Sequence, residues 1–188
     1  MKYDKSFLRN RSLLLRKKKY LTIKRFNYNL IFRLIGKHFN RKKITIGGYY
    51  PSNYEVNILK FLEEAAEKKF RITLPVIKSS NEMSFKSWAF KEPLYVNKFG
   101  ILEPKNSKKK NIPDLIMVPL VAYDNRLNRI GYGKGYYDRC LKKISKIKKN
   151  TISLGIAYSF QKCKKIPVNN HDFKLDYIFT EKGIINSN

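Results

Sequence analysis

Five short apolar runs have the length and composition of buried β-strands. They cover residues 43–49, 71–77, 115–122, 151–157 and 176–180. Apolar residues at helical spacing predict two helices within residues 1 to about 39, one helix over about 54–69, and one that begins at Tyr136. Strand, helix and strand at these lengths predict right-handed crossovers between parallel strands. The pattern therefore predicts one three-layer α/β/α domain over residues 1–188, with a Rossmann-like, mixed, largely parallel sheet and flanking helices.

The most distinctive polar stretch follows the run 115–122. Three glycines at alternate positions lie directly before the helix that begins at residue 136: Gly131, Gly133 and Gly135. A glycine-rich turn between a strand and a helix brings backbone N–H groups, the positive end of the helix dipole and Lys134 to one place. This arrangement suits a polyphosphate, and Asp138 in the first helical turn could hold a metal ion that bridges the phosphates.

The spacing of these glycines leaves the ligand open. G-x-G-x-G is neither the dinucleotide pattern G-x-G-x-x-G nor the P-loop pattern G-x-x-x-x-G-K-[ST]. Glycines between a strand and a helix can form a purely structural turn, and an aspartate in a first helical turn can simply complement the dipole. Lys5 and Arg9, four residues apart, present their charges on one helix face, yet a solvated basic helix has the same pattern.

Charge adds a second candidate function. The chain has 41 Lys and Arg against 14 Asp and Glu, a formal net charge of +27. Such a charge favours nucleic acid or another anionic surface as a partner. The cations run from Lys2 to Lys182 without gathering in one stripe, and no RNA-binding signature occurs. We therefore favour a general enrichment in lysine, although the charge does not exclude nucleic acid.

Cysteine, histidine and apolar content exclude further classes. Two cysteines argue against a disulfide framework, and with only two histidines no Cys/His metal cluster is possible. No apolar run approaches the roughly 20 residues of a membrane span, and no apolar segment of a signal peptide follows the basic first residues. We expect a cytoplasmic monomer without a membrane partner.

Residues 124–138 resemble the signature of the 5-formyltetrahydrofolate cyclo-ligase family, also called 5,10-methenyltetrahydrofolate synthetases. They match its segment D-x-x-x-x-R-[LI]-G-x-G-x-G-Y-Y-D at every specified position. Three further segments match: residues 5–9 the family's K-x-x-x-R, residues 99–104 its F-G-I-x-E-P, and residues 166–180 its closing I-P-x-x-x-H-D-x-x-x-D-x-[IV]-x-T. The resemblance extends over most of the chain.

The resemblance implies which residues form the site. ATP would contact Lys5, Arg9, Arg129, Ile130, Gly131, Tyr132, Gly133, Lys134, Gly135, Tyr136 and Tyr137. The folate would contact Tyr50, Glu55 and Tyr136, with Glu55 reaching the pterin, and Mg²⁺ would be held by Asp138 and Asp176. No side chain is expected to act as a covalent nucleophile. Arg16 is displaced by one residue from a further family arginine, so no role is transferred to it, and segment 99–104 receives no role beyond a structural turn.

The implied reaction converts 5-formyltetrahydrofolate and ATP into 5,10-methenyltetrahydrofolate, ADP and phosphate. The formyl oxygen would be phosphorylated, and N10 of the same substrate would then close the ring. Two alternatives stay open at this point: a basic nucleic-acid-binding module, and a different nucleotide-binding α/β enzyme that uses the same glycine turn. The sequence does not distinguish a formyl from a formimino substrate.

Overall fold

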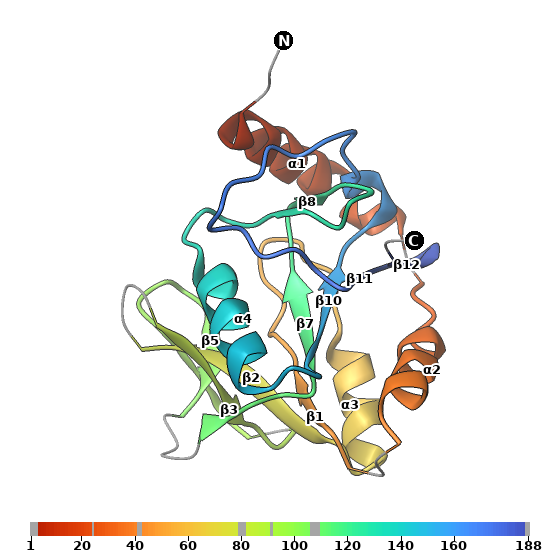
Figure 1. The fold of residues 1–188 in the computed structure, drawn as a ribbon, viewed down its shortest axis with the longest axis vertical. Helices are drawn as coiled ribbons and strands as arrows, with labels where there is room; N and C mark the ends of the chain where they lie inside the picture. Colours follow the sequence, from red (N-terminus) through yellow and green to blue (C-terminus); the bar gives the residue numbers. More distant parts are fainter. Residues whose placement is uncertain are drawn as a thin grey trace.

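The computed structural model describes residues 4–23, 25–40, 43–78, 82–90, 92–105 and 110–186. Its centre is an eight-stranded sheet in the order β12-β11-β10-β7-β1-β2-β3-β6 (Figure 1). These strands are β1 (Thr45–Gly47), β2 (Arg71–Ile77), β3 (Met83–Ser87), β6 (Lys110–Asn111), β7 (Leu115–Pro119), β10 (Ile152–Ile156), β11 (Tyr177–Thr180) and β12 (Gly183–Asn186). The five central strands pair in parallel, whereas β12, β3 and β6 pair antiparallel with their neighbours. The predicted mixed, largely parallel sheet is confirmed.

Two hairpins stand apart from this sheet. One pairs β4 (Leu94–Val96) with β5 (Leu102–Pro104), and the other pairs β8 (Ala122–Tyr123) with β9 (Arg129–Ile130). The helices are α1 (Lys5–Lys19), α2 (Asn29–His38), α3 (Leu59–Glu67) and α4 (Tyr136–Ile147), with short 3-10 helices η1 (Tyr20–Thr22) and η2 (Ser159–Gln161). Within the described residues, no helix is long and apolar enough to cross a membrane.

Strand β7 explains why the sheet is covered on both faces. Leu115 and Met117 pack in one core cluster with residues of α2 and α3, whereas Ile116 and Val118 pack in another with residues of α4. Successive side chains of a strand point to opposite faces, so a continuous apolar run needs helices on both sides. The predicted three-layer arrangement is therefore confirmed (Figure 1).

Two element boundaries differ from the prediction. The run 115–122 is not one strand, because Pro119 has no N–H with which to continue the ladder and the Val121 N–H turns to the Ile130 carbonyl at 2.7 Å. The third helix begins at Leu59 rather than near residue 54. Asn53 and Tyr54 have positive φ values of 46° and 62°, which an α-helix does not contain. Residue 55 consequently lies in a loop and not at a helix N-terminus.

Helix α1 lies across the carboxyl ends of the parallel strands, towards which the β7 arrow points (Figure 1). Its start is capped by the Asp4 carboxylate, which accepts a hydrogen bond from the Phe7 N–H at 2.7 Å. The buried Leu8 packs with Val121, Ala122 and other residues around the hairpin β8–β9. Because ligands of parallel sheets collect at this edge, α1 places its polar face where a site is expected.

Candidate functional site

A cavity of about 650 Å³ lies at the carboxyl ends of the parallel strands. Its walls come from α1, the loop after β1, the hairpin β4–β5, the glycine loop 131–135, the first turn of α4 and the loop 169–172. All the residues expected to bind ATP or folate line it: Lys5, Arg9, Tyr50, Glu55, Arg129, Ile130, Gly131, Tyr132, Gly133, Lys134, Gly135, Tyr136 and Tyr137. Asp138 lines it as well.

Arg9 joins α1 to the glycine loop. Its Nε donates a hydrogen bond to the Gly131 carbonyl at 2.8 Å, and a Cβ on Gly133 would lie 3.4 Å from the Arg9 guanidinium carbon. Gly133 and Gly135 have φ values of 97° and 67°, in the region that favours glycine. Gly135 is also the N-cap of α4. The unpaired N–H groups at the start of this helix therefore lie at the same cavity as the Arg9 guanidinium.

A second cation, Arg129, ties the glycine loop to the end of the chain. Its side chain is only 4% exposed, and Nη2 contacts Asp138 Oδ1 at 2.8 Å. Burial lowers the pKa of Arg129, and the adjacent Asp138 opposes this change. The same Asp138 oxygen accepts the Phe173 N–H at 3.0 Å. The aspartate of the first α4 turn is therefore held in a fixed direction beside the cavity.

Lys5 is held at the cavity by the loop 169–172. Its ammonium nitrogen lies 2.5 Å from Asp172 Oδ2, an oxygen that also accepts the Asn169 N–H at 2.7 Å. Partial burial raises the pKa of Asp172, but the hydrogen bonds from Lys5 and from the Asn169 N–H outweigh it, so the pKa is lowered. Asp172 is thus ionised at neutral pH and lies in the same cavity as Asp138.

The cavity wall also includes Glu55. The Ser52 N–H donates to Glu55 Oε2 at 2.9 Å, and the Ser52 hydroxyl lies 3.4 Å from the same oxygen. The pKa of Glu55 is raised overall, because burial outweighs the Ser52 hydrogen bond, the Arg16 charge and the Tyr132 hydroxyl, which all lower it. The nearby Tyr137 hydroxyl is buried without a hydrogen-bond partner among the described residues. An unpaired buried hydroxyl in a cavity wall is a position where a ligand can bind.

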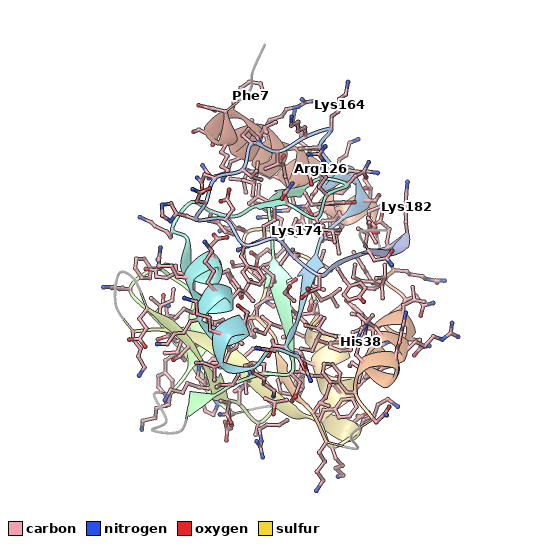
Figure 2. The ribbon with its side chains drawn as sticks, viewed as in Figure 1. Phe7, His38, Arg126, Lys164, Lys174 and Lys182 are labelled. Atoms are coloured by element: carbon pink, nitrogen blue, oxygen red, sulfur yellow. The ribbon has the colours of Figure 1, made fainter. Side chains whose placement is uncertain are left out.

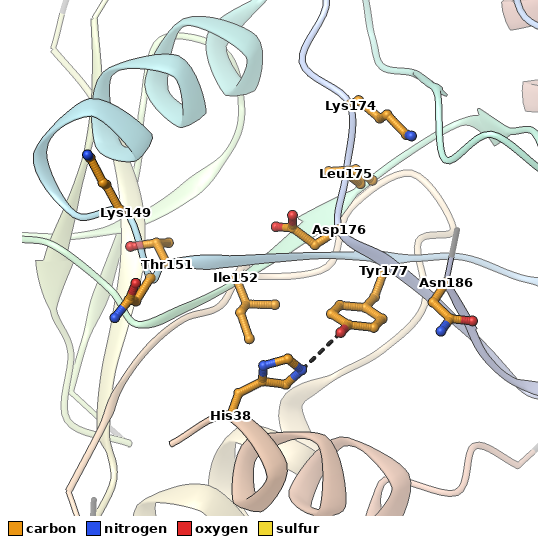
Figure 3. A pocket seen from close by; sticks show the side chains of 10 residues that line it. His38, Lys149, Thr151, Ile152, Lys174, Leu175, Asp176, Tyr177 and Asn186 are labelled. Carbon is orange, nitrogen blue, oxygen red and sulfur yellow. Dashed lines mark hydrogen bonds between the residues drawn. The ribbon is translucent and has the colours of Figure 1, made fainter. Parts of the chain in front are cut away.

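The predicted pairing of Asp138 with Asp176 is corrected by the structure. Asp176 precedes β11 at its amino end, and its Oδ2 accepts the Ser153 N–H at 2.8 Å and the Ser153 hydroxyl at 2.6 Å. It lines a different cavity of about 530 Å³, in which His38 contacts Tyr177 at 2.9 Å (Figure 3). Amino and carboxyl ends of parallel strands lie at opposite edges of a sheet, which separates Asp176 from Asp138.

Comparison with known proteins identifies the family. The model of the 5-formyltetrahydrofolate cyclo-ligase family matches residues 1–181. The chain belongs to this family. The 5-formyltetrahydrofolate cyclo-ligase of Haemophilus influenzae is 29% identical over 141 residues, which cover 72% of this chain and 74% of that protein.

Solved structures agree with this assignment. The NMR structure of Aquifex aeolicus 5,10-methenyltetrahydrofolate synthetase has a TM-score of 0.74 and 27% identity, covering 97% of this chain and 92% of that chain. The 5,10-methenyltetrahydrofolate synthetase from Mycoplasma pneumoniae has a TM-score of 0.64 and 26% identity, covering 94% and 98%. The family, the fold class and the enzymatic character expected from the sequence are confirmed.

Two parts of the cyclo-ligase cavity were missed by sequence reasoning. Asp172 was recognised only as part of the closing family segment, without a role. The hairpin β4–β5, which contains segment 99–104, forms a wall of the cavity, whereas sequence reasoning assigned this segment no role beyond a structural turn. Glu103 accepts hydrogen bonds from the Ile77 N–H at 3.2 Å and from the Asn97 side chain at 2.9 Å, and the Phe99 ring lies 6.1 Å from that of Tyr136. The match of residues 99–104 to the family segment was the one sequence feature that could have indicated a place in the site.

Gly133→Ala tests the glycine loop. Alanine at a φ of 97° is strained and would press on Arg9, so we expect a loss of about 1–2 kcal/mol of unfolding free energy and weaker ATP binding. The control is Gly36→Ala in α2, where an added Cβ meets nothing within 4 Å. This change should stabilise the protein by about 0.5–1 kcal/mol and leave ATP affinity unchanged. Urea unfolding and ATP titration measure both effects, and equal behaviour of the two variants would contradict the analysis.

Proposed function

We propose that this member of the cyclo-ligase family carries out the family reaction in the 650 Å³ cavity, converting 5-formyltetrahydrofolate and ATP into 5,10-methenyltetrahydrofolate, ADP and phosphate. The observation that carries the proposal is the meeting of Lys5, Arg9 and the glycine loop in one cavity with Glu55. One part of this cavity matches a polyphosphate, and the other offers a carboxylate to the N–H donors of a pterin.

The chemical difficulty lies in the formyl group. A formamide carbonyl is a weak electrophile, and its oxygen is a poor leaving group. Transfer of the γ-phosphoryl group of ATP to the formyl oxygen would remove both obstacles, after which N10 attacks the carbon and phosphate leaves. This ring closure is intramolecular, and well-oriented intramolecular reactions reach effective molarities on the order of 10⁵ M or more. The protein then needs no covalent nucleophile.

The side chains of the cavity therefore position the reactants and neutralise charge, as in other phosphoryl transfers. Lys5 and Arg9 would hold phosphate oxygens together with the N–H groups of the loop 131–135. Arg129 would support the phosphate site indirectly, by holding Asp138 in place. Its guanidinium is already bound to the Asp138 carboxylate and to the Phe173 carbonyl. Lys134 is exposed, and we expect it to assist without being essential.

Magnesium is the metal ion that this chemistry implies, and the residues of the cavity fit it. Asp138 and Asp172 both line the cavity, and the hydrogen bonds found for each in the described part of the chain go to one of its two oxygens. The described residues contain no group of three or more metal-binding side chains. Magnesium typically takes one or two carboxylates together with substrate phosphates, so Asp138 and Asp172 would hold it beside the phosphates and supply charge neutralisation there.

The folate would occupy the remaining part of the cavity. Glu55 would accept hydrogen bonds from the pterin, and Tyr50 and Tyr136 would border the substrate. Phe99, whose ring lies 6.1 Å from that of Tyr136, and Ile101 add apolar surface to the cavity wall. A largely apolar pocket with few fixed polar groups is the usual character of a small-molecule site.

The nucleic-acid alternative rests on the net charge of +27 alone. The cations labelled in Figure 2 lie in three connecting segments: Arg126 between β8 and β9, Lys164 and Lys174 between η2 and β11, and Lys182 between β11 and β12. We keep the expectation of a cytoplasmic monomer whose partners are ATP and the folate. Salt-sensitive binding of nucleic acid at affinities typical of specific complexes would favour the alternative.

The activity and the role of Arg9 are tested together. Purified protein mixed with MgATP and 5-formyltetrahydrofolate should show an ATP-dependent gain of methenyltetrahydrofolate absorbance. Arg9→Lys should lower kcat/KM by roughly tenfold or more, because lysine cannot keep the Gly131 contact and fork onto two phosphate oxygens. Arg11→Lys, an exposed site on the same helix, is the matched control and should be silent. No absorbance gain in the wild type would reject the function, and a silent Arg9→Lys would reject the role of the arginine.

The choice of metal-binding carboxylate gives a separate prediction. Asp172→Asn should raise the Mg²⁺ concentration needed for half-maximal rate by roughly tenfold, whereas Asp176→Asn should leave this concentration unchanged because Asp176 faces the other cavity. Initial rates at fixed ATP and varied Mg²⁺ provide the measurement. The reverse pattern, with only Asp176→Asn affected, would restore the pairing expected from the sequence.

A further inference from the structure

Arg16 is a buried cation that lies behind the folate end of the cavity. It is 1% exposed and does not line the cavity. Its Nη2 donates a short hydrogen bond to the Tyr132 hydroxyl, its Nη1 donates to the Leu120 carbonyl at 3.2 Å, and its guanidinium carbon lies 5.5 Å from the centre of the Tyr132 ring. Among the described residues, no ion pair within 4.0 Å includes Arg16.

This burial is unfavourable for a purely structural side chain. The Arg16 Nε is buried without a hydrogen-bond partner in the described structure. Removing a guanidinium from water costs free energy unless an opposite charge compensates it, and an apolar side chain of similar size is often as stable or more stable in such a place. The compensating charge here is Glu55, which lines the same cavity as Tyr132 and whose pKa is lowered by the Arg16 charge and by the Tyr132 hydroxyl.

Groups from five segments interact electrostatically with the Glu55 carboxylate. They are Arg16 of α1, Ser52 of the loop that contains Glu55, Tyr49 at the end of β1, Tyr132 of the glycine loop and Tyr137 of α4. Arg16 is the only cation in this set. The Tyr49 hydroxyl is bound to the Val56 carbonyl at 2.8 Å, so it does not donate to the carboxylate. Among these groups, only Arg16 therefore supplies a positive charge that favours the ionised form of Glu55.

We propose that Arg16 is a positioning residue: through the Tyr132 hydroxyl it orients the Glu55 carboxylate and keeps it ionised for the substrate. The inference rests on the proposed contact between Glu55 and the pterin. The amino group and the neighbouring ring N–H of a pterin are both donors, so they need two acceptor sites, which an ionised carboxylate retains beside its hydrogen bond from Ser52. A protonated carboxyl group would present a donor to a donor. Burial alone moves Glu55 towards that unsuitable form, and Arg16 opposes it.

The sign of the expected effect follows directly. Loss of the Arg16 charge raises the pKa of Glu55, so the carboxylate is protonated up to a higher pH. The acidic limb of the kcat/KM profile for 5-formyltetrahydrofolate consequently moves to higher pH. At mildly acidic pH we expect KM for the folate to rise about tenfold or more, the usual effect of losing a hydrogen bond to a charged group. The effect should shrink at alkaline pH, and the affinity for ATP should stay within about twofold.

The test compares Arg16→Met with Arg16→Lys and Lys17→Met, using ADP release at saturating MgATP from mildly acidic to mildly alkaline pH. Arg16→Lys keeps the charge and should recover most of the wild-type profile. Lys17→Met removes the same charge from the adjacent, exposed position and should overlay the wild type. A KM increase in Arg16→Met that is equal at every pH, with the acidic limb unmoved, would overturn the inference and leave only a packing role.

Two further variants separate this inference from the proposed function. Glu55→Gln should raise KM for the folate. If its KM equals that of the wild type, the contact between Glu55 and the pterin is wrong and the inference falls with it. If Glu55→Gln raises KM while Arg16→Met leaves the acidic limb in place, the inference alone fails. Should Arg16→Met not fold, Tyr132→Phe removes the bridging hydroxyl and must move the limb in the same direction, and an unmoved limb overturns the proposal.

Discussion

The hydrogen bond from Arg9 Nε to the Gly131 carbonyl joins residues 122 positions apart, and the proposed ATP site depends on it. Without it, the basic face of α1 would be solvated and the glycine loop would be an ordinary turn. The bond is possible because Leu8 anchors α1 on the hairpin β8–β9, and because Gly133 has no side chain to keep the guanidinium away. Apolar packing thus places the charge, and the absence of a Cβ lets it approach the loop.

The end of the chain completes the site from a third direction. The loop 169–172 supplies Asp172 to Lys5, and the Phe173 backbone binds both partners of the pair Arg129–Asp138. Lys5, Arg9 and Arg129 are therefore each oriented by a carboxylate or a carbonyl before any ligand binds. Such preorganisation reduces the reorganisation needed when charge moves during phosphoryl transfer.

The sequence predicted correctly those element boundaries that hydrophobic periodicity and glycine determine. The strand 71–77 was predicted with the bounds that β2 has, and the helix from Tyr136 was predicted at its true start, because periodicity and glycine define both. The start of α3 was misplaced, since the positive φ values of Asn53 and Tyr54 arise from the loop that turns Glu55 back to Ser52. Asp176 was assigned from the family resemblance, whereas the structure places Asp172, in the loop 169–172, in the cavity with Asp138 and Asp176 in the other cavity. The link from Arg16 to Glu55 depends on tertiary packing and leaves no pattern in the sequence.

A titration of isotope-labelled protein with MgATP, followed by NMR, tests the central claim most directly. Because α1 and the glycine loop are proposed to bind one triphosphate, the Arg9 Nε–H and the amides of Gly133 and Gly135 should shift together. Their shifts should follow a single dissociation constant, while exposed Arg11 in the same helix stays unchanged. Shifts confined to the glycine loop, or different dissociation constants for Arg9 and the glycines, would contradict the account.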